Sequence, residues 1–207
     1  DKATYRFTIT APKEYVVATN GVLVEKIELS DTTVWVWEEA NPMANYLAAV
    51  YIGKFQTETM PSEQGFTITN YFPDEIAEEA STAFANVPAM MTFLSERIGD
   101  YPFDSYGAVA IAEDIGTAME NQTLSFFDVA SLDEATVIHE LVHQWFGNSV
   151  SLTRWQDIWL NEGFATYFEG LWVEETEGED AFLDYMDELY GYLQEIEAIP
   201  IGDPTPE

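Results

Sequence analysis

The chain has 207 residues, of which 47% are hydrophobic and 14% aromatic, so it can bury a core and is neither disordered nor fibrous. Seven basic residues against 38 acidic ones give a formal charge of -31, which excludes nucleic acid as a partner on electrostatic grounds. No apolar run approaches the roughly 20 residues that a membrane-spanning helix needs, so we expect no membrane span.

The first quarter of the chain has the pattern of β-strands. Runs rich in β-branched and aromatic residues, separated by AP, NG and NP turns, cover residues 4–10, 15–29, 32–39 and 46–55. They predict part of an antiparallel sheet. Because the chain opens on such a run, without a charged-then-apolar leader, we expect it to be a piece of a larger protein.

Helical patterns begin after one more predicted strand, FTITNYF at residues 66–72. The turn-rich residues 60–65 (MPSEQG) mark the expected seam, and we place the boundary between residues 1–58 and 59–207. Residues 73–98 have helical spacing and an acidic first turn, and residues 106–114 read as a strand.

The sequence SLDE predicts a capping box with Ser131 as the N-cap of a helix that runs to about Phe146. A second helix is predicted over residues 157–172 and a third over residues 179–196. Eight acids between Glu174 and Glu188 are interpreted as a solvated helix face.

Both histidines of the chain lie in the first of these helices, as HELVH. Four-residue spacing on a helix places His139 and His143 on one face about 6 Å apart, the geometry of a bidentate metal clamp. Glu140 lies about 100° around the helix, where it can act as general base on a metal-activated water.

The third ligand must be a carboxylate, because the chain has no cysteine. Glu162, in WLNEGFA after eighteen intervening residues, is the candidate, and the set predicts one Zn2+ ion per chain. The alternative is two structural histidines and an unrelated helix carboxylate. It is disfavoured because the pair, the intervening Glu140 and the third ligand occur together.

The His-Glu-x-x-His sequence is followed, after eighteen residues, by Glu162. With HQWFGN starting at His143 and WLNEGFA around Glu162, this pattern resembles the aminopeptidase N family of zinc metallopeptidases. TAMEN at residues 117–121 resembles the exopeptidase motif of that family, Gly-x-Met-Glu-Asn. The resemblance implies an α+β fold, with the end of an antiparallel β N-terminal domain at 1–58. A thermolysin-like zinc metallopeptidase catalytic domain, incomplete at its C-terminus, would occupy 59–207.

The resemblance also implies a zinc-dependent aminopeptidase that hydrolyses the N-terminal bond of peptide substrates with a free N-terminus. Glu120 would bind the α-amine, and Asn121, Met119 and the backbone near Ala118 would contact the substrate. The transition-state tyrosine of the family would lie beyond Glu207, so we expect this piece to hold zinc and to be a poor peptidase.

Two positions depart from the family pattern. Thr117 stands where the family has Gly and could alter the backbone that meets the substrate carbonyl, although Gly116 lies one place earlier. Val142 replaces a small residue, which we interpret as a packing change.

Other functions and the location of the protein stay open at this point. A thermolysin-like zinc endopeptidase, a non-catalytic homologue acting as an interaction module, and an epoxide hydrolase side activity are the alternatives. The acidity is compatible with an extracellular, cell-envelope or salt-rich setting without fixing one.

Overall fold

The computed structural model describes residues 1–195, and its N-terminal part consists of two small antiparallel sheets. The first has the strand order β1-β4-β3, and the second pairs β2 with β5. The antiparallel β region predicted from the sequence is confirmed, although it is divided between two sheets. The strands are β1 Lys2–Pro12, β2 Val16–Thr19, β3 Val22–Glu28, β4 Thr32–Ala44 and β5 Val50–Gly53.

The turn at Asn20–Gly21 separates the two sheets. Gly21 adopts φ +88°, and a Cβ there would lie 2.1 Å from the carbonyl oxygen of Glu38, so the close approach requires glycine. Beyond this turn β3 pairs with β4, and not with β2 as in a hairpin. The turn expected at Asn41–Pro42 does not interrupt β4, because a register shift in its pairing with β1 accommodates the proline.

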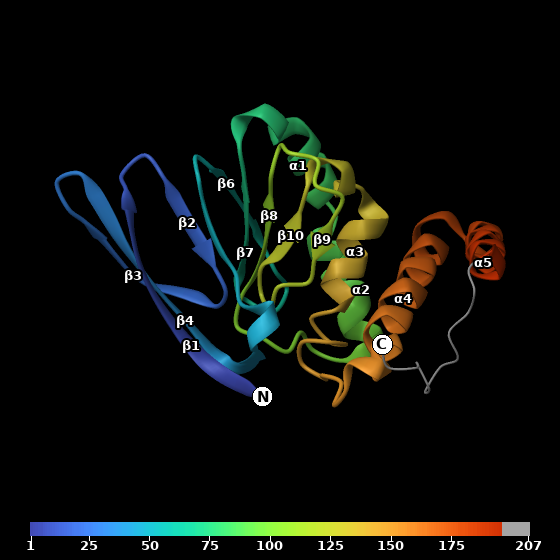
Figure 1. The fold of residues 1–207 in the computed structure, drawn as a ribbon. Helices are drawn as coiled ribbons and strands as arrows, with labels where there is room; N and C mark the ends of the chain where they lie inside the picture. The colour runs from blue at the N-terminus through green and yellow to red at the C-terminus, as the bar shows by residue number, and fades with distance from the viewer. Residues whose placement is uncertain (196–207) are drawn as a thin grey trace.

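A five-stranded mixed sheet occupies the centre of the molecule (Figure 1), in the order β6-β7-β8-β10-β9. β7, β8 and β10 are parallel, and both edge strands are antiparallel to their neighbours. Residues 60–65 form the end of β6 and the turn to β7, so the boundary expected between residues 58 and 59 falls within β6. The strands are β6 Gln56–Pro61, β7 Thr67–Phe72, β8 Tyr106–Ala110, β9 Ala118–Met119 and β10 Ser125–Phe127.

The helices cover the face of this sheet that is opposite the N-terminal strands (Figure 1). They are α1 Ala77–Phe84, α2 Val87–Ile98, α3 Glu134–Val142, α4 Trp159–Glu177 and α5 Glu179–Glu195, with 3-10 turns η1 Asn45–Leu47, η2 Asp74–Ile76, η3 Val129–Ser131 and η4 Trp155–Asp157. Each helical region predicted from the sequence is found with shifted ends, and residue 196 of the third lies outside the described residues. Within residues 1–195, no helix has the length and apolar character of a membrane span.

The central sheet is buried on both faces. Along β8, Ala108 and Ala110 belong to the core under the helices, whereas Val109 belongs to the core under the N-terminal strands. α3 contributes Ile138 and Leu141, both completely buried, to the larger core. Burial of one such side chain is worth about 1.5 to 3 kcal/mol, so α3 is held firmly on the sheet.

The start of α3 differs from the prediction. Its N-cap is Asp133, whose side chain accepts a hydrogen bond from the Thr136 amide (2.9 Å). The predicted Ser131–Glu134 capping box is therefore wrong. Ser131 forms a capping box with Asp128 around η3 instead, because the buried Asp128 carboxylate accepts its amide.

The end of α3 also differs, because the helix stops at Val142 and not near Phe146. A 3-10-type hydrogen bond from the Gln144 amide to the Leu141 carbonyl (3.1 Å) tightens the backbone there. His143 is consequently the C-cap residue of α3.

Candidate metal centre

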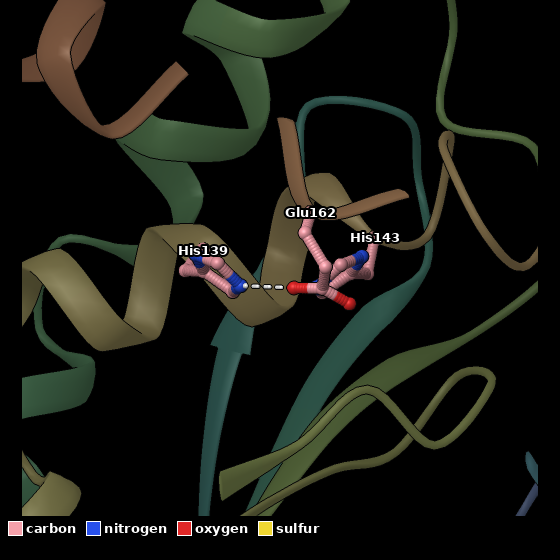
Figure 2. Close-up of side chains that lie close together, drawn as sticks. All are labelled: His139, His143 and Glu162. Atoms are coloured by element: carbon pink, nitrogen blue, oxygen red, sulfur yellow. Dashed lines mark hydrogen bonds and ion pairs between the residues drawn. The ribbon is translucent and has the colours of Figure 1, made fainter. Parts of the chain in front are cut away.

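Three side chains from α3 and α4 converge on one point (Figure 2). His139 lies in the last turn of α3, His143 caps it, and Glu162 lies in the first turn of α4. Glu162 Oε2 is 3.3 Å from His139 Nε2 and 3.5 Å from His143 Nε2. One ligand atom from each residue lies within 4.8 Å of the others, so the group can hold a metal ion. The structure thus brings together the three residues predicted as ligands.

A glycine in the turn after α3 allows α4 to approach. Gly147 has φ +121°, and a Cβ there would lie 2.9 Å from Nδ2 of Asn161, the residue before Glu162. Asn161 is completely buried. Any side chain at position 147 would therefore strain the backbone and displace the first turn of α4, and Glu162 with it.

Each histidine uses its second ring nitrogen to fix the orientation of its ring. His143 Nδ1 donates to the carbonyl oxygen of Phe146 (3.1 Å), and His139 Nδ1 is hydrogen-bonded to Glu169. These bonds favour the tautomer in which Nε2 is the ligand atom. Two imidazole nitrogens and one carboxylate oxygen are a donor set that zinc takes in catalytic sites, so the residues fit zinc.

The carboxylates around the two histidines favour positive charge at the ligand atoms. Burial opposes the charging of His139, but Glu162 and Glu169 outweigh it and raise its pKa to about 10. Burial likewise opposes ionisation of Glu162, but the two histidines outweigh it and lower its pKa to about 2. The site therefore stabilises positive charge where the Nε2 atoms meet Glu162.

Glu140 is 6% exposed, and its Oε2 is buried without a hydrogen-bond partner among the described residues. Burial raises the pKa of the Glu140 carboxyl to about 7. The two histidines oppose this shift, while Glu120 and Glu162 add to it. A carboxyl group with a pKa near neutrality and a free oxygen can both accept and return a proton.

Glu169 and Tyr185 extend the centre beyond the predicted residues. Glu169 bonds to His139 through Oε1, and its Oε2 accepts a hydrogen bond from the Tyr185 hydroxyl (2.8 Å). Glu169 lies seven residues after Glu162, about two helical turns along one face of α4, so helical periodicity could have identified it. Tyr185 lies on α5, and nothing in the sequence indicates this contact.

The TAMEN segment lies beside α3 at the edge of the central sheet. Ala118 and Met119 form β9, which is half-buried, and the half-buried Glu120 follows. Asn121 is 4% exposed; its Nδ2 donates to the Leu47 carbonyl (3.2 Å) and its Oδ1 accepts from the Tyr51 hydroxyl (2.7 Å). The Asn121 side chain therefore holds η1 and β5 against this segment.

The two departures from the family pattern fit the backbone. The left-handed conformation falls on Gly116, with φ +73°, so Thr117 is unstrained. The amides of Ile115, Gly116 and Thr117 all donate to Oδ2 of Asp128, at 2.9, 2.6 and 3.1 Å. Val142 is completely buried in the larger core, as its interpretation as a packing residue requires.

Together the fold and the site define a metallopeptidase-type domain, in which a His-Glu-x-x-His helix and a carboxylate from the next helix form the metal site. A family model described as "Peptidase family M1 domain" matches residues 82–198. The chain belongs to this family, which confirms the resemblance to the aminopeptidase N family.

Relatives named as aminopeptidases match most of the chain. Glutamyl aminopeptidase of Sus scrofa is 36% identical over 197 residues, covering 86% of this chain and 21% of the relative. Aminopeptidase N of Streptomyces lividans is 30% identical over 189 residues, covering 81% and 21%. The crystal structure of an M1 zinc metallopeptidase from Deinococcus radiodurans has a TM-score of 0.87 at 28% identity, covering 97% of this chain and 47% of that one. The chain thus spans about a fifth of these curated relatives and about half of the solved structure.

Proposed function

We propose that the protein containing this chain is a zinc-dependent aminopeptidase that removes the N-terminal residue of peptides. The observation that carries the proposal is the three-ligand cluster with the buried, unpartnered Glu140 carboxyl oxygen beside it. His139, His143 and Glu162 would hold one zinc ion per chain. Bound zinc polarises the scissile carbonyl and lowers the pKa of water to about 7.

Glu140 and Glu120 have separate roles in this proposal. Glu140 takes the proton of the attacking water and returns it to the leaving amine, for which its pKa of about 7 is suited. Glu120 is near enough to contribute to that pKa, so its carboxylate would bind the substrate ammonium close to the reacting bond. A fixed ammonium sets which peptide bond reaches Glu140.

The similar proteins support a peptide substrate. The relatives from Sus scrofa and Streptomyces lividans are named as aminopeptidases. A mutant of the Deinococcus radiodurans metallopeptidase is described as bound to a Tyr-Ser-Ala substrate, and it has a TM-score of 0.89 at 27% identity. An extended peptide could pair with the outer side of β9, which is an edge strand.

Glu140→Gln tests the assignment of the base. In the whole protein that contains this chain, we expect zinc to remain stoichiometric and turnover of an alanine anilide to fall by about 100 to 10,000-fold, since the base is lost and the ligands are not. Metal analysis and steady-state kinetics measure the two effects. Glu188→Gln, on the exposed side of α5, is the matched control and should behave as wild type. Loss of zinc from Glu140→Gln would show that the roles are misassigned.

The same assay tests the free-amine requirement. The wild-type protein should cleave peptides with a free N-terminus and leave their N-acetylated forms, because acetylation removes the charge that Glu120 binds. Glu120→Ala should raise KM and lower kcat for the free peptides. Equal cleavage of free and acetylated peptides by the wild type would favour a thermolysin-like endopeptidase.

A further inference from the structure

Two side chains just after His143 hold the segment that carries Glu120. Asn148 Nδ2 donates to the carbonyl oxygen of Glu120 (2.7 Å), and Gln144 Oε1 accepts from the Thr123 amide (2.8 Å). Gln144 Nε2 also lies 3.4 Å from the Asn121 carbonyl oxygen. Gln144 and Asn148 are both 0% exposed, so water cannot replace these bonds and their loss leaves buried groups unpaired.

The backbone of this segment is strained where Gln144 binds it. Thr123 has φ +63°, and it is the one non-glycine residue with a positive φ among residues 1–195. A β-branched residue in the left-handed region is strained and persists only where its surroundings impose that conformation. Here the Thr123 amide is held by Gln144, and its Oγ1 accepts from the Gly21 amide (2.7 Å). The bend between Glu120 and β10 is therefore imposed from outside the segment.

These contacts join the proposed amine anchor to the metal ligands by a short route. The chain itself connects Glu120 to His143 only through β10, η3 and the whole of α3. Gln144 is the residue after His143, and the Asn148 amide donates to the carbonyl oxygen of His143 (3.0 Å). A displacement of His143 is thus transmitted directly to the backbone of Glu120.

We propose that Gln144 and Asn148 are positioning residues, which fix the distance from Glu120 to the metal ligands and so direct cleavage to the first peptide bond. The inference rests on the proposed aminopeptidase function. Neither side chain needs to touch the substrate, because both act through the backbone of residues 120–123. An error of about 1 Å in such a placement can cost about 100-fold in rate.

Asn148→Leu removes the donor to Glu120 at similar volume, and Gln144→Glu keeps the acceptor for Thr123 while removing the amide donor. In the whole protein, Asn148→Leu should raise KM for free-amine anilides about 10 to 100-fold and lower the preference for free over N-acetylated peptides at least about tenfold. Gln144→Glu should also raise KM and lower the preference for free peptides, by smaller factors than Asn148→Leu. The zinc dissociation constant, measured by chelator competition, should stay within about twofold, because the ligands on α3 and α4 are unchanged.

Ser149→Ala is the matched control, since Ser149 is exposed on the same turn, and it should match wild type. This inference would be overturned, and the proposed function would not, if the wild type prefers free over N-acetylated peptides and both variants keep its KM and its preference. Loss of zinc in parallel with activity would overturn it too, because the residues would then be merely structural. A wild type that cleaves free and acetylated peptides equally would instead overturn the proposed function. If Asn148→Leu fails to fold, Gln144→Glu decides by the same two measurements.

Discussion

Glu169 and Tyr185 determine how firmly His139 is presented as a ligand. The Glu169 side chain is 15% exposed, so its bond to His139 Nδ1 is shielded from water. Burial, Glu169 and the hydrogen bond to it raise the pKa of Tyr185, which keeps its hydroxyl protonated as a donor. Carboxylates in this position orient the imidazole and make it a stronger ligand. We therefore expect Tyr185, a residue on α5, to contribute to metal affinity without touching the metal.

Substitutions at these two positions should change zinc affinity in a fixed order. In the 207-residue chain, Glu169→Gln should weaken zinc binding about 10 to 100-fold, and Tyr185→Phe should weaken it by less, since Glu169 remains. Competition with a chromophoric chelator measures both dissociation constants. Tyr190→Phe, at a 63% exposed position of the same helix, is the control. Equal affinities for Tyr185→Phe and Tyr190→Phe would show that the hydroxyl plays no part.

At the scale of elements, the short strand β9 depends on the loop before it. β9 has two residues, and within residues 1–195 it pairs with β10 alone, which is too little to hold an edge strand in place. The completely buried Asp128 carboxylate gathers three successive amides of that loop and the Ser131 amide. Burial opposes ionisation of Asp128, but these hydrogen bonds outweigh it and lower its pKa from 3.8 to about 2. Asp128 thus anchors the strand that leads to Glu120.

The depressed pKa of Asp128 predicts a stability effect with a defined pH window. A folded-state pKa below the unfolded value stabilises the fold above about pH 4, and this contribution is lost as the pH falls towards 2. Asp128→Asn should therefore lower the free energy of unfolding by about 1 to 3 kcal/mol at pH 7. The difference from wild type should shrink between pH 4 and pH 2, as urea titrations at several pH values would measure.

Asp114→Asn is the control for this series, because Asp114 is exposed in the same loop. It should leave the free energy of unfolding unchanged at each pH. A constant difference between wild type and Asp128→Asn down to pH 2 would mean that the charge of Asp128 does not stabilise the loop.

At the scale of the whole molecule, charge repulsion opposes folding. The net charge is -31, and no Lys or Arg follows Arg154, so the acids of α4 and α5 have few cations near them. One such cation is Arg97 on α2, whose guanidinium lies 2.7 Å from a carboxylate oxygen of Glu175 on α4. Exposed pairs of this kind are worth at most about 1 kcal/mol, which cannot offset repulsion among so many acids.

Salt should therefore stabilise this chain. Raising NaCl from 0.01 M to 1 M shortens the Debye length from about 30 Å to about 3 Å and screens the repulsion. We expect Tm to rise by about 4 °C or more, which corresponds to about 1 kcal/mol or more at this size. Differential scanning calorimetry measures Tm, and a comparison of NaCl with sodium sulfate at equal ionic strength separates two effects. Both salts screen charge, whereas sulfate also stabilises proteins because it is excluded from their surface. Stabilisation by sulfate alone would contradict the role of charge.

Much of the metal site could be predicted from the sequence, because it depends on spacing within single elements. His139 and His143 share a helix face wherever four residues separate them, and Glu140 follows from the same periodicity. Glu162 could be proposed from its distance along the chain. The helices and most of the strands were also predictable, since apolar periodicity reflects which face each element buries. The strands β6, β9 and β10 were not predicted, and the last two are too short to show a period. The capping residue of α3 was not, because Asp128 competes for Ser131 from an earlier strand end.

Only the tertiary structure decided which side chains meet between elements. The contact of Tyr185 with Glu169, the bonds of Gln144 and Asn148 to the Glu120 segment, and the amides around Asp128 all join different elements. Such contacts depend on how helices and strands pack, and packing reflects the whole core rather than any local pattern. The sequence by itself therefore determined the two histidine ligands and Glu140, because helical geometry acts over four residues, and it proposed Glu162 as their partner. That Glu162 meets the histidines is a contact between α3 and α4. The supporting side chains came from the structure, because they lie close only after the sheet and helices have assembled.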